Sequence, residues 1–159
     1  MQVKDSSMTT GQTTFGDEPF PQVVLLDLNL RDKAAALTRL AGEVAAVALD
    51  PAAVLKALLW REDLGSTGMG DGIAIPHASV PGLTQPFGVF ARLRPPVDFA
   101  AVDDKPVDIV VLLLTPQTAK GDLMALSQVA RRLRSPAFCN ALRQAEDEVD
   151  VWEAWRSFA

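Results

Sequence analysis

The chain has 159 residues, a length that suits one domain with a hydrophobic core. Hydrophobic residues make up 48% of it and charged residues 22%, which excludes wholesale disorder because disorder requires low hydrophobicity and a high net charge. The net charge of −5 argues against binding to nucleic acid, since nucleic-acid-binding domains are usually basic. The one histidine, His77, and the one cysteine, Cys139, exclude a two-histidine metal cluster, a Cys-based zinc site and an internal disulfide. We therefore predict no bound metal.

The N-terminal segment, residues 1–19, is polar and rich in Ser, Thr and Gly, without the apolar stretch of a signal peptide. We predict a flexible tail there and a single domain over residues 20–159. The longest apolar run, Val107–Leu114, is interrupted by Asp108 and is far shorter than the roughly 18–20 residues of a membrane helix. We expect a cytoplasmic protein that does not insert into membranes.

Apolar periodicity, caps and turn residues predict an alternation of helices and strands. In chain order, they predict a strand or extended lead-in over Val23–Leu30, a helix over Ala34–Ala48 capped by Asp32, a helix from Asp50-Pro51 to about Asp63, a loop over Gly65–Gly72, a short extended piece over Ile73–Pro76, strands over Phe87–Leu93 and Pro106–Leu114, and helices over Asp122–Leu133, from Ser135-Pro136, and over Val149–Phe158. The last strand is apolar at every position from Ile109 to Leu114, as expected for burial on both faces. The predicted fold is an α/β sandwich with helices on both sides of the sheet.

The segment REDLGSTGMGDGIAIPH, residues 61–77, holds four glycines in eight residues followed by the one histidine. It does not match a Walker-type phosphate loop, because Asp71 follows Gly70 where that loop has Lys-Ser/Thr. It does not match a dinucleotide fingerprint either, since a helix precedes it and an extended piece follows. The pattern disfavours nucleotide binding, and we predict no cofactor.

The same loop can nevertheless hold an anion through its backbone amides. Ser66 and Thr67 add hydroxyl donors, and Arg61 adds a forked cation. A histidine beside such a cup can attack a phosphoryl group with its neutral ring nitrogen while the cup stabilises the developing charge. The predicted phosphate-binding residues are Gly65, Ser66, Thr67, Gly68 and Gly70. The residues alone leave a second interpretation open, in which His77 is a hydrogen-bonded histidine of structural use in a glycine-rich turn.

The stretch GSTGMGDGIAIPH, with Arg61-Glu62 ahead of it, closely resembles the active-site signature of one protein family. The family is that of the enzyme IIA domains of the fructose/mannitol class, in the bacterial phosphoenolpyruvate-dependent phosphotransferase system. FGVFARLRPPVDFAAVDDKPVDIVVLLLTP and LSQVARRLRSPAFCNALRQAE resemble later parts of that family, so the resemblance covers about residues 22–156. LWREDLGSTGMGDGIAIPH, the PGL at 81–83 and VDDKPVDIVVLLLTP look most like the nitrogen-regulatory enzyme IIA.

The resemblance implies a mixed central β-sheet flanked by helices. It places the phosphoacceptor at His77, an arginine beside the phosphoryl site at Arg61, and the surrounding loop at Gly65–Gly72. The implied donor is an HPr-like phosphocarrier protein. The chain departs from the family at Asp122, where members commonly have a second histidine. A carboxylate there would orient the ring of His77 or repel an incoming phosphoryl group.

Three functions remain open on this basis. We favour a nitrogen-type phosphohistidine protein that accepts phosphate on His77 and binds regulatory protein targets. The second is a sugar-specific component that passes phosphate to a IIB domain for fructose/mannitol-type uptake. The third is a binding module that has lost phosphoryl transfer, and the replacement of the family's second histidine by Asp122 would be the sign of that loss.

Several other polar residues have a structural interpretation that we favour over a functional one. We assign Asp103, Asp104 and Asp108 to a turn and a strand edge rather than to an acid–base pair, and Cys139 to an inert, packed position. Arg131, Arg132 and Arg134 are expected on a solvated helix face, with a docking patch as the alternative. An apolar stripe at helical spacing, expected to close the core, is made by Trp152, Trp155 and Phe158.

Overall fold

The computed structural model describes residues 20–117 and 119–158, with the backbone alone for residues 119–122. The tail predicted over residues 1–19 lies outside the described residues and stays a prediction. Among the described helices, none has the length and apolar character needed to cross a membrane.

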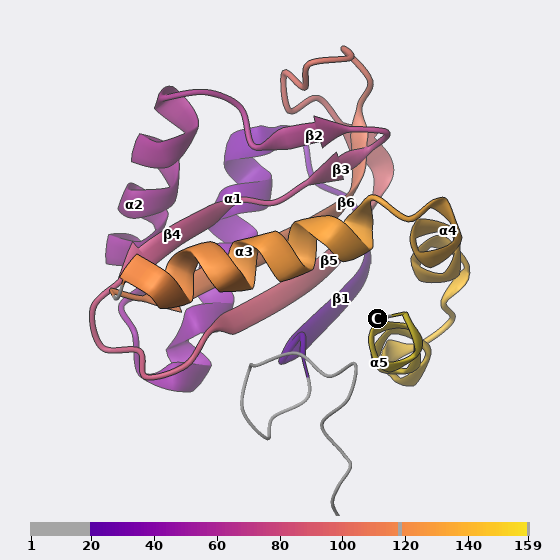
Figure 1. Cartoon of the computed structure of the whole chain (residues 1–159). Helices are drawn as coiled ribbons and strands as arrows, with labels where there is room; N and C mark the ends of the chain where they lie inside the picture. The colour runs from indigo at the N-terminus through magenta and orange to yellow at the C-terminus, as the bar shows by residue number, and fades with distance from the viewer. Residues whose placement is uncertain (1–19, 118, 159) are drawn as a thin grey trace, which may run out of the picture.

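Six strands form one mixed sheet. They are β1 (Val23–Leu28), β2 (Gly68–Gly70), β3 (Ile73–Ala74), β4 (His77–Val80), β5 (Phe87–Val97) and β6 (Val107–Pro116). The order is β1-β5-β6-β3-β2, and β4 continues along β6 beyond β3 in the same register (Figure 1). β5 and β6 are antiparallel, whereas β1 runs parallel to β5, and β3 and β4 run parallel to β6. The sheet is therefore mixed, as the resemblance implied.

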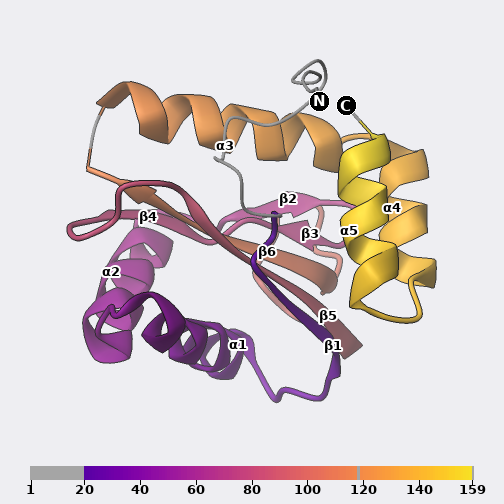
Figure 2. The same ribbon diagram turned by 90° about the horizontal axis from the view of Figure 1, so that it is seen from below.

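Helices cover both faces of this sheet, which Figure 2 shows edge-on. One face carries α1 (Lys33–Ala41), the 3₁₀ helix η2 (Gly42–Val47) and α2 (Pro51–Asp63). The other carries α3 (Ala119–Leu133), α4 (Pro136–Gln144) and α5 (Glu148–Ser157). The predicted α/β fold with helices on both faces is confirmed.

The strand β6 is the centre of the core. Its alternate side chains belong to two different hydrophobic clusters: Ile109 and Leu113 face the α3–α5 layer, and Val110 and Leu112 face the α1–α2 layer. All four are fully buried. This arrangement explains why the strand is apolar at successive positions rather than at every second one.

The predicted helix starts are confirmed in their capping contacts. Asp32 accepts a hydrogen bond from the Ala35 amide at 2.8 Å, and Asp50 accepts one from the Ala52 amide at 3.1 Å. The helix predicted over Ala34–Ala48 is wrong in its second half, because the α-helix ends at Ala41 and continues as η2. The change occurs at Gly42, since glycine weakens a helix interior through its large backbone entropy.

The loop predicted over Gly65–Gly72 is also partly wrong. Its middle, β2, pairs antiparallel with β3, so the segment is a small hairpin. Asp71 and Gly72 form its tip, with φ of 57° and 82°. Positive φ at both central residues defines a type I′ turn, for which Asp-Gly is a preferred sequence. The Asp-Gly pair was therefore the signal that identifies this hairpin.

Candidate functional site

The backbone around His77 is held by the central strand. His77 opens β4, and its backbone pairs with Leu113 of β6. The Leu113 amide donates to the carbonyl of Pro76 at 2.9 Å, and Pro76 itself is buried. The imidazole is partly exposed. In the described part of the chain, β6 is the one strand paired with β4, so His77 lies at a sheet edge.

The orientation of the His77 ring is set by one hydrogen bond. Nδ1 lies 2.8 Å from the carbonyl oxygen of Ile75. A carbonyl oxygen only accepts, so Nδ1 carries the hydrogen of this bond. In a neutral ring the other nitrogen, Nε2, then keeps its lone pair. This tautomer leaves the lone pair of Nε2 available as a nucleophile, as phosphoryl transfer to that nitrogen would need.

The glycine-rich loop is braced on the end of α2. The Thr67 amide donates to Glu62 Oε1 at 3.1 Å, and the Thr67 hydroxyl donates to the same oxygen. The Thr67 carbonyl accepts from the Ile75 amide at 3.1 Å, which ties the loop to the segment that leads to His77. Lys33 of α1 balances the carboxylate of Glu62, with 2.9 Å between Nζ and Oε2.

A second brace runs from the loop to the connection between β5 and β6. The Ser66 hydroxyl donates to the carbonyl of Phe99 and accepts from the Gly68 amide at 2.9 Å. A Cβ on Gly68 would lie 2.8 Å from Cβ of Ala101, so this position admits no side chain without movement. The hydroxyls of Ser66 and Thr67 and the amide of Gly68 are thus engaged within the protein. Their predicted contact with phosphate stays a prediction, and the geometry assigns them a bracing role.

Arg61 occupies the last turn of α2, the helix that packs against β4. Its Nη1 donates to the carbonyl of Gly65 at 2.9 Å, one residue beyond the C-cap Leu64, so the guanidinium folds back over the start of the glycine-rich loop. A guanidinium has five N–H donors, so this bond leaves capacity for an anion. Asp122 is part of α3, and its side chain lies outside the described residues, so its predicted influence on His77 stays a prediction.

The other acidic residues have the structural roles predicted for them. Asp103 accepts from the amides of Asp71 and Lys105 at 2.9 and 3.1 Å, and these two bonds lower the pKa of its carboxyl group. Asp108 forms an ion pair with Arg143, with 2.8 Å between Oδ2 and Nε. The bond to Asp108 raises the pKa of Arg143 above its ordinary value.

The basic cluster of α3 differs from its prediction at one position. Arg131 and Arg134 are exposed as expected, but Arg132 is only 7% exposed. Its guanidinium lies 5.6 Å from the ring centre of Trp155 on α5, a distance typical of a cation–π contact. Burial lowers the pKa of Arg132. The α5 helix covers this side chain, and a helix packed from another part of the chain is not visible in local sequence.

The aromatic stripe of α5 contributes to the core as predicted. Trp155 is buried and meets the rings of Phe20 and Phe138 edge-on at 5.1 and 4.9 Å. Trp152 is partly buried and donates from Nε1 to the carbonyl of Pro21 at 2.7 Å. Cys139 is buried close by; burial raises the pKa of its thiol, as expected for an inert cysteine.

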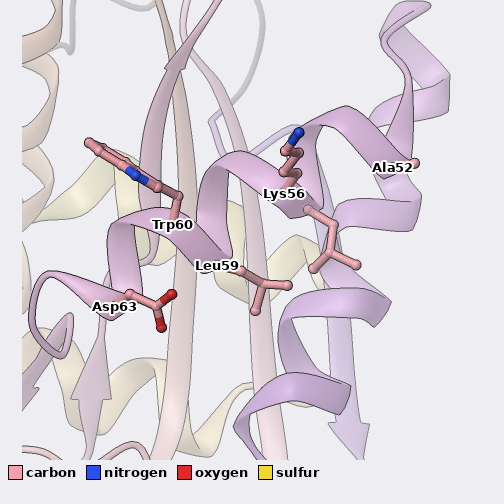
Figure 3. Close-up of a pocket in the computed structure, with 6 residues that line it drawn as sticks. Ala52, Lys56, Leu59, Trp60 and Asp63 are labelled. Carbon is pink, nitrogen blue, oxygen red and sulfur yellow. The ribbon is translucent and has the colours of Figure 1, made fainter.

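An open groove lies on the outer side of α2, and His77 is not among the residues that line it (Figure 3). Trp60 is 66% exposed there, and the groove is lined by Ala52, Leu55, Lys56, Leu59, Trp60 and Asp63. Sequence reasoning did not single out this surface, where Leu59 and Trp60 are both exposed; adjoining exposed apolar side chains are a feature of contact surfaces. Among the described residues, no group of three His, Cys, Asp or Glu side chains is placed to hold a metal ion.

A mixed sheet between two helical layers, with a glycine-rich hairpin leading to a histidine at the sheet edge, defines an α/β domain of the enzyme IIA type. The chain belongs to the family described as "Phosphoenolpyruvate-dependent sugar phosphotransferase system, EIIA 2", whose sequence profile matches residues 20–157.

Three relatives place the chain within this family. It is 43% identical over 134 residues to the "Nitrogen regulatory protein" of Bradyrhizobium diazoefficiens, covering 83% of this chain and 88% of the relative. It is 39% identical over 103 residues to the "PTS system fructose-specific EIIA component" of Haloferax volcanii, covering 64% of this chain and 67% of the relative. The crystal structure of nitrogen regulatory protein IIA-Ntr from Neisseria meningitidis matches with a TM-score of 0.78 at 34% identity, over 83% of this chain and 92% of that one. The resemblance to the nitrogen-regulatory enzyme IIA is confirmed.

Proposed function

We propose that this protein accepts a phosphoryl group on Nε2 of His77 from an HPr-like phosphocarrier and that its phosphorylation state governs binding to regulatory protein targets. The observation that carries the proposal is the hydrogen bond from His77 Nδ1 to Ile75, because it leaves the Nε2 lone pair available at a partly exposed site. The relatives named nitrogen regulatory proteins favour the regulatory part. A function of this kind is carried out in the cytoplasm, where the carrier is.

The chemical step needs no cofactor. The Nε2 lone pair forms a bond to phosphorus while the bond from phosphorus to the carrier's leaving atom breaks, and the electron pair of that bond stays with the carrier. The imidazole of His77 becomes cationic as the new bond forms. The carbonyl dipole of Ile75 stabilises that charge through the Nδ1–H bond, and Arg61 stabilises the charge on the phosphoryl oxygens.

A phosphorylation assay tests this proposal. The purified protein is incubated with phosphoenolpyruvate, enzyme I and the carrier, and its intact mass is followed with time. We expect one phosphoryl group that is labile in acid and stable in base, and no labelling of the His77→Ala variant. Labelling of that variant would place the acceptor elsewhere. A parent protein that stays unlabelled would favour the binding module that has lost phosphoryl transfer.

The sugar-specific alternative has its own support, because the Haloferax volcanii relative is named a fructose-specific component. The two functions differ in where the phosphoryl group goes next. Phosphorylated protein is mixed with a IIB domain of the fructose/mannitol class, and loss of label is measured. Rapid transfer would favour sugar uptake. Loss of label that is many times slower than from a sugar-specific IIA under the same conditions would favour regulation.

A further inference from the structure

Glu62 is a buried carboxylate that the proposed phosphoryl transfer does not yet use. It lies in the last turn of α2 and its residue is only 9% exposed. Burying a charged group costs free energy unless the group is paired and hydrogen-bonded, so the carboxylate of Glu62 must be compensated by its neighbours. The compensation comes from Lys33 on one oxygen and from the amide and hydroxyl of Thr67 on the other.

From Thr67 a short series of contacts reaches the catalytic ring. The Thr67 carbonyl accepts from the Ile75 amide at 3.1 Å, and the Ile75 carbonyl accepts from His77 Nδ1 at 2.8 Å. The amide and the carbonyl of Ile75 belong to different peptide units, so one hydrogen bond does not polarise the other. The contacts instead fix where the Ile75 carbonyl lies. Each residue in the series is held on both sides.

We propose that Glu62 is the positioning residue for His77: by fixing Thr67, and through it Ile75, it holds the carbonyl that selects the Nδ1–H tautomer. The role in phosphoryl transfer rests on the proposed function, whereas the effect on the tautomer does not. Glu62 touches no substrate in this scheme. It acts through two intervening residues, and its loss releases the Ile75 carbonyl from its fixed direction.

The tautomer can be measured without ambiguity, because the chain contains a single histidine. Long-range ¹H–¹⁵N NMR of the ¹⁵N-labelled full chain reports which ring nitrogen carries the hydrogen. We expect the parent and Glu62→Gln to show mainly the Nδ1–H form, since the glutamine carbonyl still accepts from Thr67. Glu62→Leu, which removes both acceptors at similar volume, should shift His77 toward the Nε2–H form.

The matched control is Asp27→Asn. Asp27 forms an ion pair at 2.8 Å with Arg92, a buried residue of β5, and β1 is separated from β4 by two strands. This variant loses an ion pair of comparable geometry and should leave the tautomer unchanged. An equal shift in Asp27→Asn and Glu62→Leu would overturn the proposal, because the shift would then report only general destabilisation.

Single-turnover kinetics of phosphorylation supply the second measurement. Here kcat denotes the rate constant at saturating carrier, and KM denotes the carrier concentration that gives half of that rate. With the carrier as phosphoryl donor, Glu62→Leu should lower kcat roughly 10–100-fold, the scale for a misplaced reacting group, with KM for the carrier unchanged. Glu62→Gln should restore most of kcat. A folded Glu62→Leu protein that keeps both the Nδ1–H tautomer and the parental kcat would overturn the proposal.

A milder variant keeps the proposal testable if Glu62→Leu does not fold. Thr67→Val removes the hydroxyl and keeps the backbone bond to Glu62, so a smaller tautomer shift in the same direction is expected, and no shift would count against the series. If the parent accepts no phosphate but the tautomer still follows Glu62, the proposed function fails and the positioning role stands. If the parent is phosphorylated and the tautomer is the same with and without Glu62, the proposed function stands and the positioning role fails.

Discussion

Nδ1 of His77 lies 2.8 Å from the carbonyl oxygen of Ile75, two residues earlier in the chain. Pro76 lies between them, and its ring restricts φ, so the short span has little freedom. Many functional histidines are oriented by a carboxylate, which loses its charge in acid. Here the acceptor is a backbone carbonyl, which does not titrate, so this hydrogen bond does not depend on the ionisation of its acceptor.

Arg61→Lys tests the role of the guanidinium at the helix end. Lysine keeps the charge but loses the fork that binds two phosphoryl oxygens at once. We expect phosphorylation to slow by roughly 10–100-fold, equivalent to about 1.5–3 kcal/mol for one charge-assisted contact. The rate of label uptake from the carrier measures this effect. Equal rates would remove Arg61 from the phosphoryl site, and a lower melting temperature would show that its bond to Gly65 is its main role.

Asp122→His tests the departure of this chain from the family. A carboxylate within about 6 Å of the phosphoryl group would repel it and shorten the lifetime of phosphorylated His77. Replacement by histidine should therefore slow hydrolysis of the phosphohistidine and speed its formation. Asp122→Asn separates loss of charge from gain of an imidazole. Unchanged lifetimes in both variants would mean that the carboxylate points away from His77.

Trp60→Ala tests whether the groove on α2 contacts the phosphocarrier. Trp60 is exposed and precedes Arg61 on the same helix, so a protein that reaches Arg61 can cover the indole. We expect KM for the carrier to rise by roughly tenfold, as for loss of about 1.4 kcal/mol of contact energy, with kcat unchanged. Val149→Ala is the control, because Val149 is 51% exposed on α5, in the helical layer on the other face of the sheet. A Trp60→Ala protein with parental KM would show that the carrier binds elsewhere.

Two glycine substitutions should have opposite effects on the free energy of unfolding. Gly68→Ala places a Cβ 2.8 Å from Cβ and 3.1 Å from Cα of Ala101, and we expect a loss of about 1–3 kcal/mol from overpacking. At Gly42, nothing lies within 4 Å of an added Cβ and φ is −61°, so Gly42→Ala should gain about 0.4–1 kcal/mol. Urea unfolding measures both. Similar changes in the two variants would contradict the packing at Ala101.

The ion pair between Asp27 and Arg92 predicts a pH dependence of stability. The hydrogen bond from Arg92 is the main cause that lowers the pKa of Asp27 in the folded protein, with burial opposing it. A lowered folded-state pKa stabilises the protein above the ordinary pKa of about 3.9, and the gain is lost as the pH falls through the folded value. The advantage of the parent over Asp27→Asn should therefore be full at neutral pH and should decrease in acid. An advantage that stays constant down to about pH 3 would contradict this.

Local patterns in the sequence determined most of the secondary structure and pointed to the candidate phosphoacceptor. The caps at Asp32 and Asp50 and the apolar run Ile109–Leu114 of β6 depend on near neighbours, so they are visible without a fold. His77 was found because it is the one histidine and follows a glycine-rich loop. Even the missed hairpin had a local signal in Asp71-Gly72.

What only the tertiary structure decided are contacts between residues far apart in the chain. Lys33 meets Glu62, the Ser66 hydroxyl meets the Phe99 carbonyl, and Arg132 is covered by Trp155. The Ser66 hydroxyl, which the sequence offered as a phosphate donor, is engaged by one of these distant partners, and its contact with phosphate stays a prediction. A side chain's donors and acceptors are known from its type, but which partner they meet depends on how the layers pack, and that packing is a property of the whole chain rather than of any segment.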